Sequence, residues 1–364
     1  MSLAIISDQP TATALLQEIA QLCVGHGAQW HHELQVEVAV GGMRLLAPPG
    51  TTGALISLPT DLLVPIGEAQ WSSSPDALEL LQPPSDATPV QRELLQLHTE
   101  LYNATGKLRW WSNQHPARLA ETSRDIAASL ELLKPCHRAQ TKRSAAEGFL
   151  ATRSFGWRPN PEQQQHHPVL MPLIDLLNHH HQGSSFRIDD GAMQIKAKQA
   201  GGRECFAHYG QRRDVLDLAL HYGHCDLSTP FAHSAPQEIA VEGIGHIRIE
   251  HQGQRAPVHP FDPPRITLEP DGLRVSHLCC HQAHPERVQT MLSLALQAQL
   301  KRGGHDAASA FCLAQRGLNA IGEANTRLLD PLVAAAEASS HPGGATLAAA
   351  ARRQASIIAA VMRA

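Results

Sequence analysis

Hydrophobic and polar positions follow two different periods along the first seventy residues. Near the N-terminus the apolar residues recur every three or four positions, which predicts an amphipathic helix. They are Leu15, Leu16, Ile19, Leu22 and Cys23. Farther along, alternation of apolar and polar residues over 34–40 and the apolar run 54–58 predict short strands. Glycines and prolines separate these runs, as is typical of turns between strands.

The middle of the chain changes to polar loops and helical spacing. From Trp71 onward, helices are predicted over 89–103 and 117–133, where leucines and isoleucines line one face. Strand patterns return after Arg153, over 193–197 and 204–209. This order predicts a helical insertion within a β-rich unit.

The C-terminal third begins with strand patterns and becomes helical. A helix is predicted from Pro285 to Arg302, because proline suits the first helical position and Gly303 follows the last turn. Further helices are predicted over 318–338 and 346–362. We therefore expect an α+β fold with four segments: 1–70 and 151–235 as the two parts of the β-rich core, 71–150 as the helical insertion, and 236–364 as a mostly helical C-terminal domain.

Composition restricts the classes of partner. Among 364 residues, 43% are hydrophobic and 18% charged, with a formal net charge of −4. Nucleic acid is not expected as a partner, since there is no basic excess to meet phosphates. No uninterrupted apolar run reaches the ~18–20 residues of a membrane span, and the N-terminus lacks the cationic region of a secretory signal. We expect a cytoplasmic protein whose seven cysteines, without a CxxC pair, stay reduced. The oligomeric state is left open.

Two segments carry candidate chemistry. The first, PVLMPLIDLLNH over 168–179, predicts a short helix that starts at Pro172 and ends at Asn178, an amide residue that favours turns. The second, GRECFAHYG over 202–210, predicts a strand ending at Tyr209. The alternatives are a helix cap beside solvated histidines for the first, and core packing of the tyrosine for the second.

A third candidate is Arg153 in the segment TRSF, since a guanidinium matches a carboxylate with two parallel hydrogen bonds. Its alternative is a surface salt bridge. Together, in this order, the segments resemble the SET-domain protein methyltransferases of the Rubisco large-subunit lysine methyltransferase-like class. That class has S-R-x-F, then P-x-x-D-x-x-N-H, then G-E-E-x-F-x-x-Y-G and Y-G-F. The segment GMRLLA over 42–47 matches its G-x-G-L-x-A loop imperfectly.

The resemblance covers nearly the whole chain and implies a function. It implies transfer of a methyl group from S-adenosylmethionine to a lysine nitrogen of a protein or peptide substrate, with Tyr209 as the catalytic residue. The residues that it assigns to cofactor binding are Gly42, Met43, Arg153, Asp175, Asn178, His179 and Tyr209. It places Tyr222 and His224 in the acceptor pocket.

Three positions depart from the class pattern. Arg44 replaces the second glycine of G-x-G, Asp214 stands where the class has asparagine, and His224 stands where Y-G-F has phenylalanine. Two alternatives therefore stay open: a histidine N-methyltransferase, and a non-catalytic binding protein on the same scaffold. No metal is assigned, because the adjacent Cys279 and Cys280 would point to opposite faces of a strand.

Overall fold

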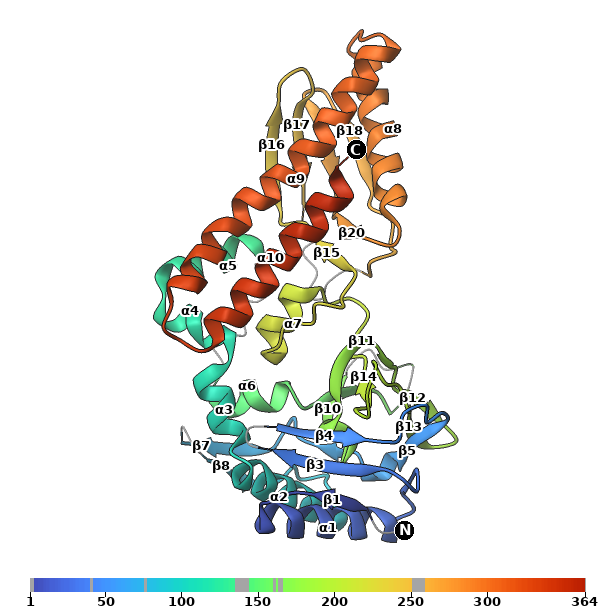
Figure 1. Cartoon of the computed structure of the whole chain (residues 1–364), viewed down its shortest axis with the longest axis vertical. Helices are drawn as coiled ribbons and strands as arrows, with labels where there is room; N and C mark the ends of the chain where they lie inside the picture. Colours follow the sequence, from blue (N-terminus) through green and yellow to red (C-terminus); the bar gives the residue numbers. More distant parts are fainter. Residues whose placement is uncertain are drawn as a thin grey trace. The chain divides into compact units, whose positions relative to one another are not determined.

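The fold of this chain is α+β (Figure 1). The computed structural model describes residues 3–39, 42–74, 77–134, 144–159, 162, 166–250 and 259–363. The chain divides into two compact units. Unit 1 comprises Met1–Asn113 and Arg143–Gly210, and unit 2 comprises Gln114–Lys142 and Gln211–Ala364.

Small sheets build most of unit 1. The strands are β1 (Ala4–Ile6), β2 (Gln29–Trp30), β3 (Gln35–Ala39), β4 (Gly42–Leu46), β5 (Ala54–Pro59), β6 (Val64–Pro65), β7 (Gln70–Ser73), β8 (Leu78–Gln82), β9 (Phe155–Trp157), β10 (His167–Leu170), β11 (Asn178–Ser184), β12 (Arg187–Asp189), β13 (Ala192–Lys196) and β14 (Phe206–Ala207). They pair in the orders β1-β3-β4, β6-β10-β9, β12-β13-β5-β2, β7-β8 and β11-β14. The strands predicted near 34–40, 54–58 and 193–197 are confirmed as β3, β5 and β13.

Helices complete unit 1. They are α1 (Pro10–Gly25), α2 (Pro89–Ala104), α3 (Lys107–Gln114, whose last residue belongs to unit 2) and α6 (Ala145–Ala151), with short 3-10 turns η1 (Thr60–Leu62) and η4 (Ile174–Leu176). The predicted face of α1 is buried, since Leu16 and Ile19 are fully enclosed in the hydrophobic core with Leu55 and Ile56 of β5. At the start of α2, the side chains of Thr88 and Gln91 form a capping box, which satisfies backbone N–H groups there.

Unit 2 combines helices with a four-stranded sheet. The helices are η2 (Pro116–Arg118), α4 (Leu119–Thr122), α5 (Arg124–Leu133), α7 (Val215–Tyr222), α8 (Pro285–Arg302), α9 (Ala307–Ala338) and α10 (Gly343–Met362). The strands are β15 (Phe231–His233), β16 (Gln237–Val241), β17 (Gly245–Ile249), β18 (Ile266–Glu269), β19 (Gly272–Val275) and β20 (Cys279–His281), in the orders β16-β17-β19-β18 and β15-β20. In Figure 1 the long helices α9 and α10 lie side by side and pack together.

Helix limits in unit 2 show what the pattern predicted and what it missed. Both ends of α8 are confirmed. Helix α9 begins at Ala307, earlier than the predicted start at 318. The apolar pattern misses its first turns because they bury only small residues such as Ala310 and Ala314. The prediction of a single helix over 117–133 is wrong. Ser123 caps α5 by accepting a hydrogen bond from the Ile126 N–H, so the helix is interrupted after α4.

The two units divide the chain differently from the expected segments. The insertion expected at 71–150 is shared between them, because Leu119, Ile126 and Leu130 join a core with Leu329 and Leu332 of α9. Burial of these apolar faces explains why α4 and α5 belong to unit 2. Among the described residues, no helix is long and apolar enough to span a bilayer.

Candidate functional site

Two segments distant in sequence meet in unit 1 at β11 and β14. The strands pair in parallel, with Asn178 opposite Phe206 and His179 opposite Ala207. Gly183 permits this approach, because a Cβ atom at that position would lie 2.5 Å from the carbonyl carbon and oxygen of Ala207. The pairing corrects the expectation for Asn178, which begins a strand and does not end a helix.

Tyr209 follows β14 and contacts the Asn178–His179 segment. Its backbone N–H donates to Nδ1 of His179 at 3.0 Å, and the two rings lie 5.2 Å apart between centroids. Its hydroxyl donates to the carbonyl of Leu177. Since His179 accepts at Nδ1, the neutral ring carries its proton at Nε2. A phenol that donates its proton keeps acceptor lone pairs on the oxygen, the property that orientation of an amine requires.

The Asn178 side chain connects β11 with β4. Its amide nitrogen donates to Oε1 of Glu204 at 2.8 Å and to the carbonyl of Met43 at 3.4 Å. Gly42 and Met43 lie in β4, which pairs with β3, so this segment is a strand where a loop was expected from the G-x-G pattern. The Met43 carbonyl nevertheless accepts a hydrogen bond from Asn178, as expected if both residues belong to one site.

Arg44, a departure from the class pattern, extends this network. It donates from Nε to Glu37, and its Nη1 lies 3.7 Å from Oε2 of Glu204. Hydrogen bonding to Glu37 raises the pKa of the Arg44 guanidinium. Arg44 therefore helps to hold the Glu204 carboxylate, which accepts the hydrogen bond from Asn178. The arginine that stands where the class has glycine thus has definite structural partners.

Arg153 and Asp175 form a second, more buried part of the site. Arg153 donates from Nη1 to the backbone carbonyl of Asp175 at 3.4 Å, and its guanidinium lies 5.8 Å from the ring centroid of Phe149. The Asp175 carboxylate accepts from the Tyr102 hydroxyl at 2.6 Å through Oδ2. Its Oδ1 lies 3.9 Å from Nε2 of His98. Burial, and then the charge of Asp175, raises the pKa of Tyr102.

The backbone just before Asp175 is strained. Leu173 has φ 64° and ψ −36°, a conformation that residues with a Cβ rarely adopt. Strained positions occur often at functional sites, where the surrounding structure enforces them. Here the strained residue starts the turn that carries Asp175 toward Tyr102.

Tyr222 and His224 belong to unit 2. Tyr222 is the last residue of α7, which Gly223 ends in the left-handed conformation at φ 78°. The guanidinium of Arg213 lies 5.4 Å from the Tyr222 ring centroid, and the rings of Tyr222 and His224 lie 6.3 Å apart. Their assignment to an acceptor pocket stays a prediction.

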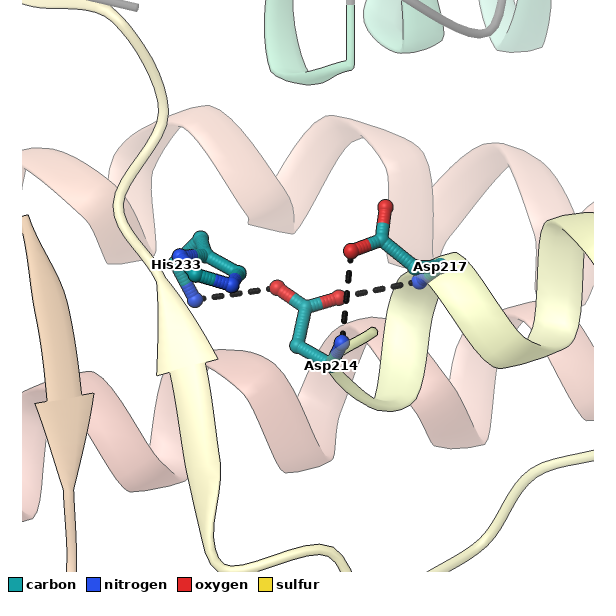
Figure 2. Close-up of side chains that lie close together, drawn as sticks. All are labelled: Asp214, Asp217 and His233. Atoms are coloured by element: carbon teal, nitrogen blue, oxygen red, sulfur yellow. Dashed lines mark hydrogen bonds between the residues drawn. The ribbon is translucent and has the colours of Figure 1, made fainter. Parts of the chain in front are cut away.

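Asp214, the second departure, lies in a buried charge cluster of unit 2. Figure 2 shows Asp214 and Asp217 exchanging hydrogen bonds in a capping box at the start of α7, while the backbone N–H of His233 donates to Asp214 at 2.9 Å. The Lys134 Nζ atom lies 2.8 Å from the carboxylate of Asp214 and 3.0 Å from that of Asp217. Although burial disfavours its charge, the two carboxylates raise the pKa of Lys134.

This cluster has the residue types of a metal site, since ligand atoms of Asp214, Asp217 and His233 lie within 4.8 Å of one another. The ammonium of Lys134 already supplies the positive charge that the two carboxylates need. Burial lowers the pKa of His233. We therefore assign the cluster a structural role, in which Asp214 caps α7 and anchors the chain that follows α5.

Sequence patterns missed several partners of the predicted residues. Lys134, Tyr102 and His98 were not singled out, and Glu204 was noted only within its motif. One feature of the sequence could have drawn attention to Tyr102, since it is one of only three tyrosines. The side-chain partners of the Asp175 carboxylate, Tyr102 and His98, lie more than seventy residues before it, so no local pattern identifies them.

Comparisons with known proteins say little about the function of this chain. No protein-family model and no curated protein sequence matches it. One solved structure similar to it is the SET domain of LSMT bound to lysine and AdoHcy, with 11% sequence identity and a TM-score of 0.40. The match covers 96% of this chain and 90% of that one. An identity of 11% says nothing about the activity of this chain.

Proposed function

We propose that this protein is an N-methyltransferase that uses S-adenosylmethionine and acts on a lysine side chain of a protein or peptide. One observation carries the proposal: Tyr209 contacts His179 and Leu177, thirty or more residues earlier, beside Asn178. The ordered motifs that resemble the SET-domain class support it, because Arg153, Asn178 and Tyr209 all lie in unit 1. Gly42, Met43, Arg153 and Asp175 complete the proposed cofactor-binding set.

The chemistry explains which groups such a site needs. A lysine has a pKa near 10.4, so presenting its neutral amine at pH 7 costs roughly 4–5 kcal/mol. A narrow apolar channel lowers that cost by disfavouring the charged amine. S-adenosylmethionine, when bound, supplies an electrophilic methyl group on a sulfonium. The protein then has to hold the amine in line with that methyl group, and fixed geometry contributes several kcal/mol to the rate.

Individual residues have distinct proposed roles in this scheme. The Tyr209 hydroxyl, which is held by the Leu177 carbonyl, orients the acceptor nitrogen through its oxygen. Asn178 and His179 hold the donor, and Arg153 binds its carboxylate. Tyr222 and His224 border the acceptor in the proposal.

Binding and turnover are measured separately. Calorimetry with S-adenosylhomocysteine is expected to show saturable binding that Asn178→Ala weakens at least about tenfold, since a polar contact to the ligand is lost. Asn319→Ala, at an exposed position of α9, is the matched control and should bind normally. Absence of binding at millimolar ligand rejects the proposal.

Transfer is followed with tritium-labelled cofactor and lysate from a deletion strain, and the labelled residue is identified by mass spectrometry. Methyl-lysine supports the proposal. Methyl-histidine supports the alternative acceptor, for which the replacement of the class phenylalanine by His224 is the motivating observation. Binding without transfer to any protein supports the non-catalytic alternative, which the departures from the class pattern at Arg44, Asp214 and His224 motivate.

A further inference from the structure

Arg213 lies between two residues that are fixed to the buried charge cluster of unit 2. On one side, Nε2 of His233 lies 3.1 Å from the carbonyl oxygen of Arg212, which is a hydrogen-bond distance. On the other side, Asp214 caps α7 and accepts from the backbone N–H of His233 (Figure 2). The Asp214 carboxylate also accepts from Lys134. The backbone of Arg213 therefore has little freedom, and its side chain starts from a defined point.

The side chain of Arg213 contacts Tyr222, the last residue of α7. Its guanidinium carbon lies 5.4 Å from the centroid of the Tyr222 ring, within the range of a cation–π contact. A guanidinium that stacks on a ring keeps N–H donors at its edges, where they match a carboxylate with two parallel hydrogen bonds. Arg118 of the same unit has such a partner in Glu121, at 2.7 Å. For Arg213, the described part of the chain contains no carboxylate at salt-bridge distance.

The acidic residues near Arg213 in the sequence are directed into the protein. Asp214 and Asp217 are 0% and 1% exposed, and both carboxylates face the ammonium of Lys134. Asp226 is buried as well and accepts from hydroxyl groups of its own loop. These three carboxylates are thus engaged inside unit 2 and do not offset the charge of Arg213 at the surface.

The other rings beside Tyr222 are imidazoles. The ring centroids of His221 and His224 lie 4.5 and 6.3 Å from that of Tyr222. An imidazole is neutral or positive and never negative, so these neighbours do not compensate the guanidinium either. An acidic side chain is therefore the chemical complement of this surface, whereas a basic one is repelled by it.

We propose that Arg213 is a specificity-determining residue, which binds an aspartate or glutamate side chain close in sequence to the acceptor lysine. The inference rests on the proposed function, in which Tyr222 borders the acceptor. It adds the class of substrate, a lysine within an acidic segment of a protein or peptide. Because the backbone and the Tyr222 ring already hold the guanidinium, little conformational entropy is lost when a carboxylate binds it.

A charge-reversal experiment tests this pairing. The probe is a library of synthetic peptides with one central lysine and with glutamate, alanine or arginine at one neighbouring position, and transfer is measured with tritium-labelled cofactor. For the preferred position, kcat/KM of the wild type should be about 5- to 50-fold higher with glutamate than with arginine. Arg213→Glu should reverse this preference, and Arg213→Gln should remove most of it. Arg302→Glu, at an exposed position of α8, is the control and should keep the wild-type preference.

Steady-state constants separate specificity from a structural role. Since the carboxylate is bound equally before and during transfer, Arg213→Gln should raise KM for the glutamate peptide while kcat stays within about twofold. For the alanine peptide, the variant should behave like the wild type. An arginine that only stabilised α7 would, when replaced, lower the activity on all three peptides alike.

The outcomes distinguish this inference from the proposed function. If the wild type transfers no methyl group to any peptide or lysate protein, the proposed function fails and this inference fails with it. If the wild type methylates the three kinds of peptide equally, the role of Arg213 is refuted and the proposed function stands. The same conclusion follows if Arg213→Glu keeps a preference for glutamate, or if both variants lose activity on all peptides alike.

Discussion

The buried cluster of Lys134, Asp214 and Asp217 allows a quantitative test of how unit 2 is held together. The side chains of these residues are 7%, 0% and 1% exposed, and the two N···O distances are 2.8 and 3.0 Å. Lys134→Met removes the cation but keeps most of the volume. Breaking a buried ion pair from one side costs about 3–5 kcal/mol, since the remaining charges are left uncompensated.

For a unit of this size, that loss corresponds to a melting temperature lower by roughly 6–20 °C. Far-UV circular dichroism during heating or urea titration follows the loss of helix, and the longest helices, α8, α9 and α10, belong to unit 2. Lys301→Met, at an exposed position, is the control and should melt like the wild type.

The effect of Lys134→Met should also depend on pH. Without the ammonium, the facing carboxylates of Asp214 and Asp217 raise the folded-state pKa of one of them above its unfolded value. The folded variant then binds an extra proton as pH falls, so its deficit should shrink between pH 7 and pH 5. In the wild type Lys134 stays charged between pH 5 and pH 7 because its pKa is raised, so it adds no pH dependence to the stability there. A pH 7 loss below about 1 kcal/mol, equal to that at pH 5, would refute the reasoning.

Three further predictions address other positions. Tyr209→Phe removes the hydroxyl that donates to Leu177 and should lower the methyl-transfer rate by about 100-fold or more, while calorimetry shows S-adenosylhomocysteine affinity within about threefold. Gly223→Ala forces φ 78° on alanine and places its Cβ 2.7 Å from Cδ2 of His115, so urea midpoints should report a loss of about 1–3 kcal/mol. An unchanged midpoint contradicts this. Lys107 binds fewer protons folded than unfolded, since its pKa falls from 10.5 to about 7. Its contribution to stability should therefore increase from pH 7 to pH 9, by at most about 1.4 kcal/mol per pH unit, and Lys107→Met should remove this increase.

Local features of the sequence were enough for many elements of the fold. The face of α1, the limits of α8 and the strands β3, β5 and β13 follow from apolar period and from proline or glycine at the ends. These signals are local, because the hydrogen bonds of a helix and the alternation of a strand involve residues near in sequence. The same motifs pointed to His179 and Tyr209, which the structure brings together.

The tertiary structure decided which distant residues pair with one another. Asn178 begins a strand because β14, almost thirty residues later, pairs with it. Lys134 joins Asp214 across 80 positions, and Tyr102 joins Asp175 across 73. Such pairs form only when distant apolar faces are buried together and the enclosed charges must find one another. The sequence by itself determined many of the elements and the candidate residues, while long-range burial decided which charges meet.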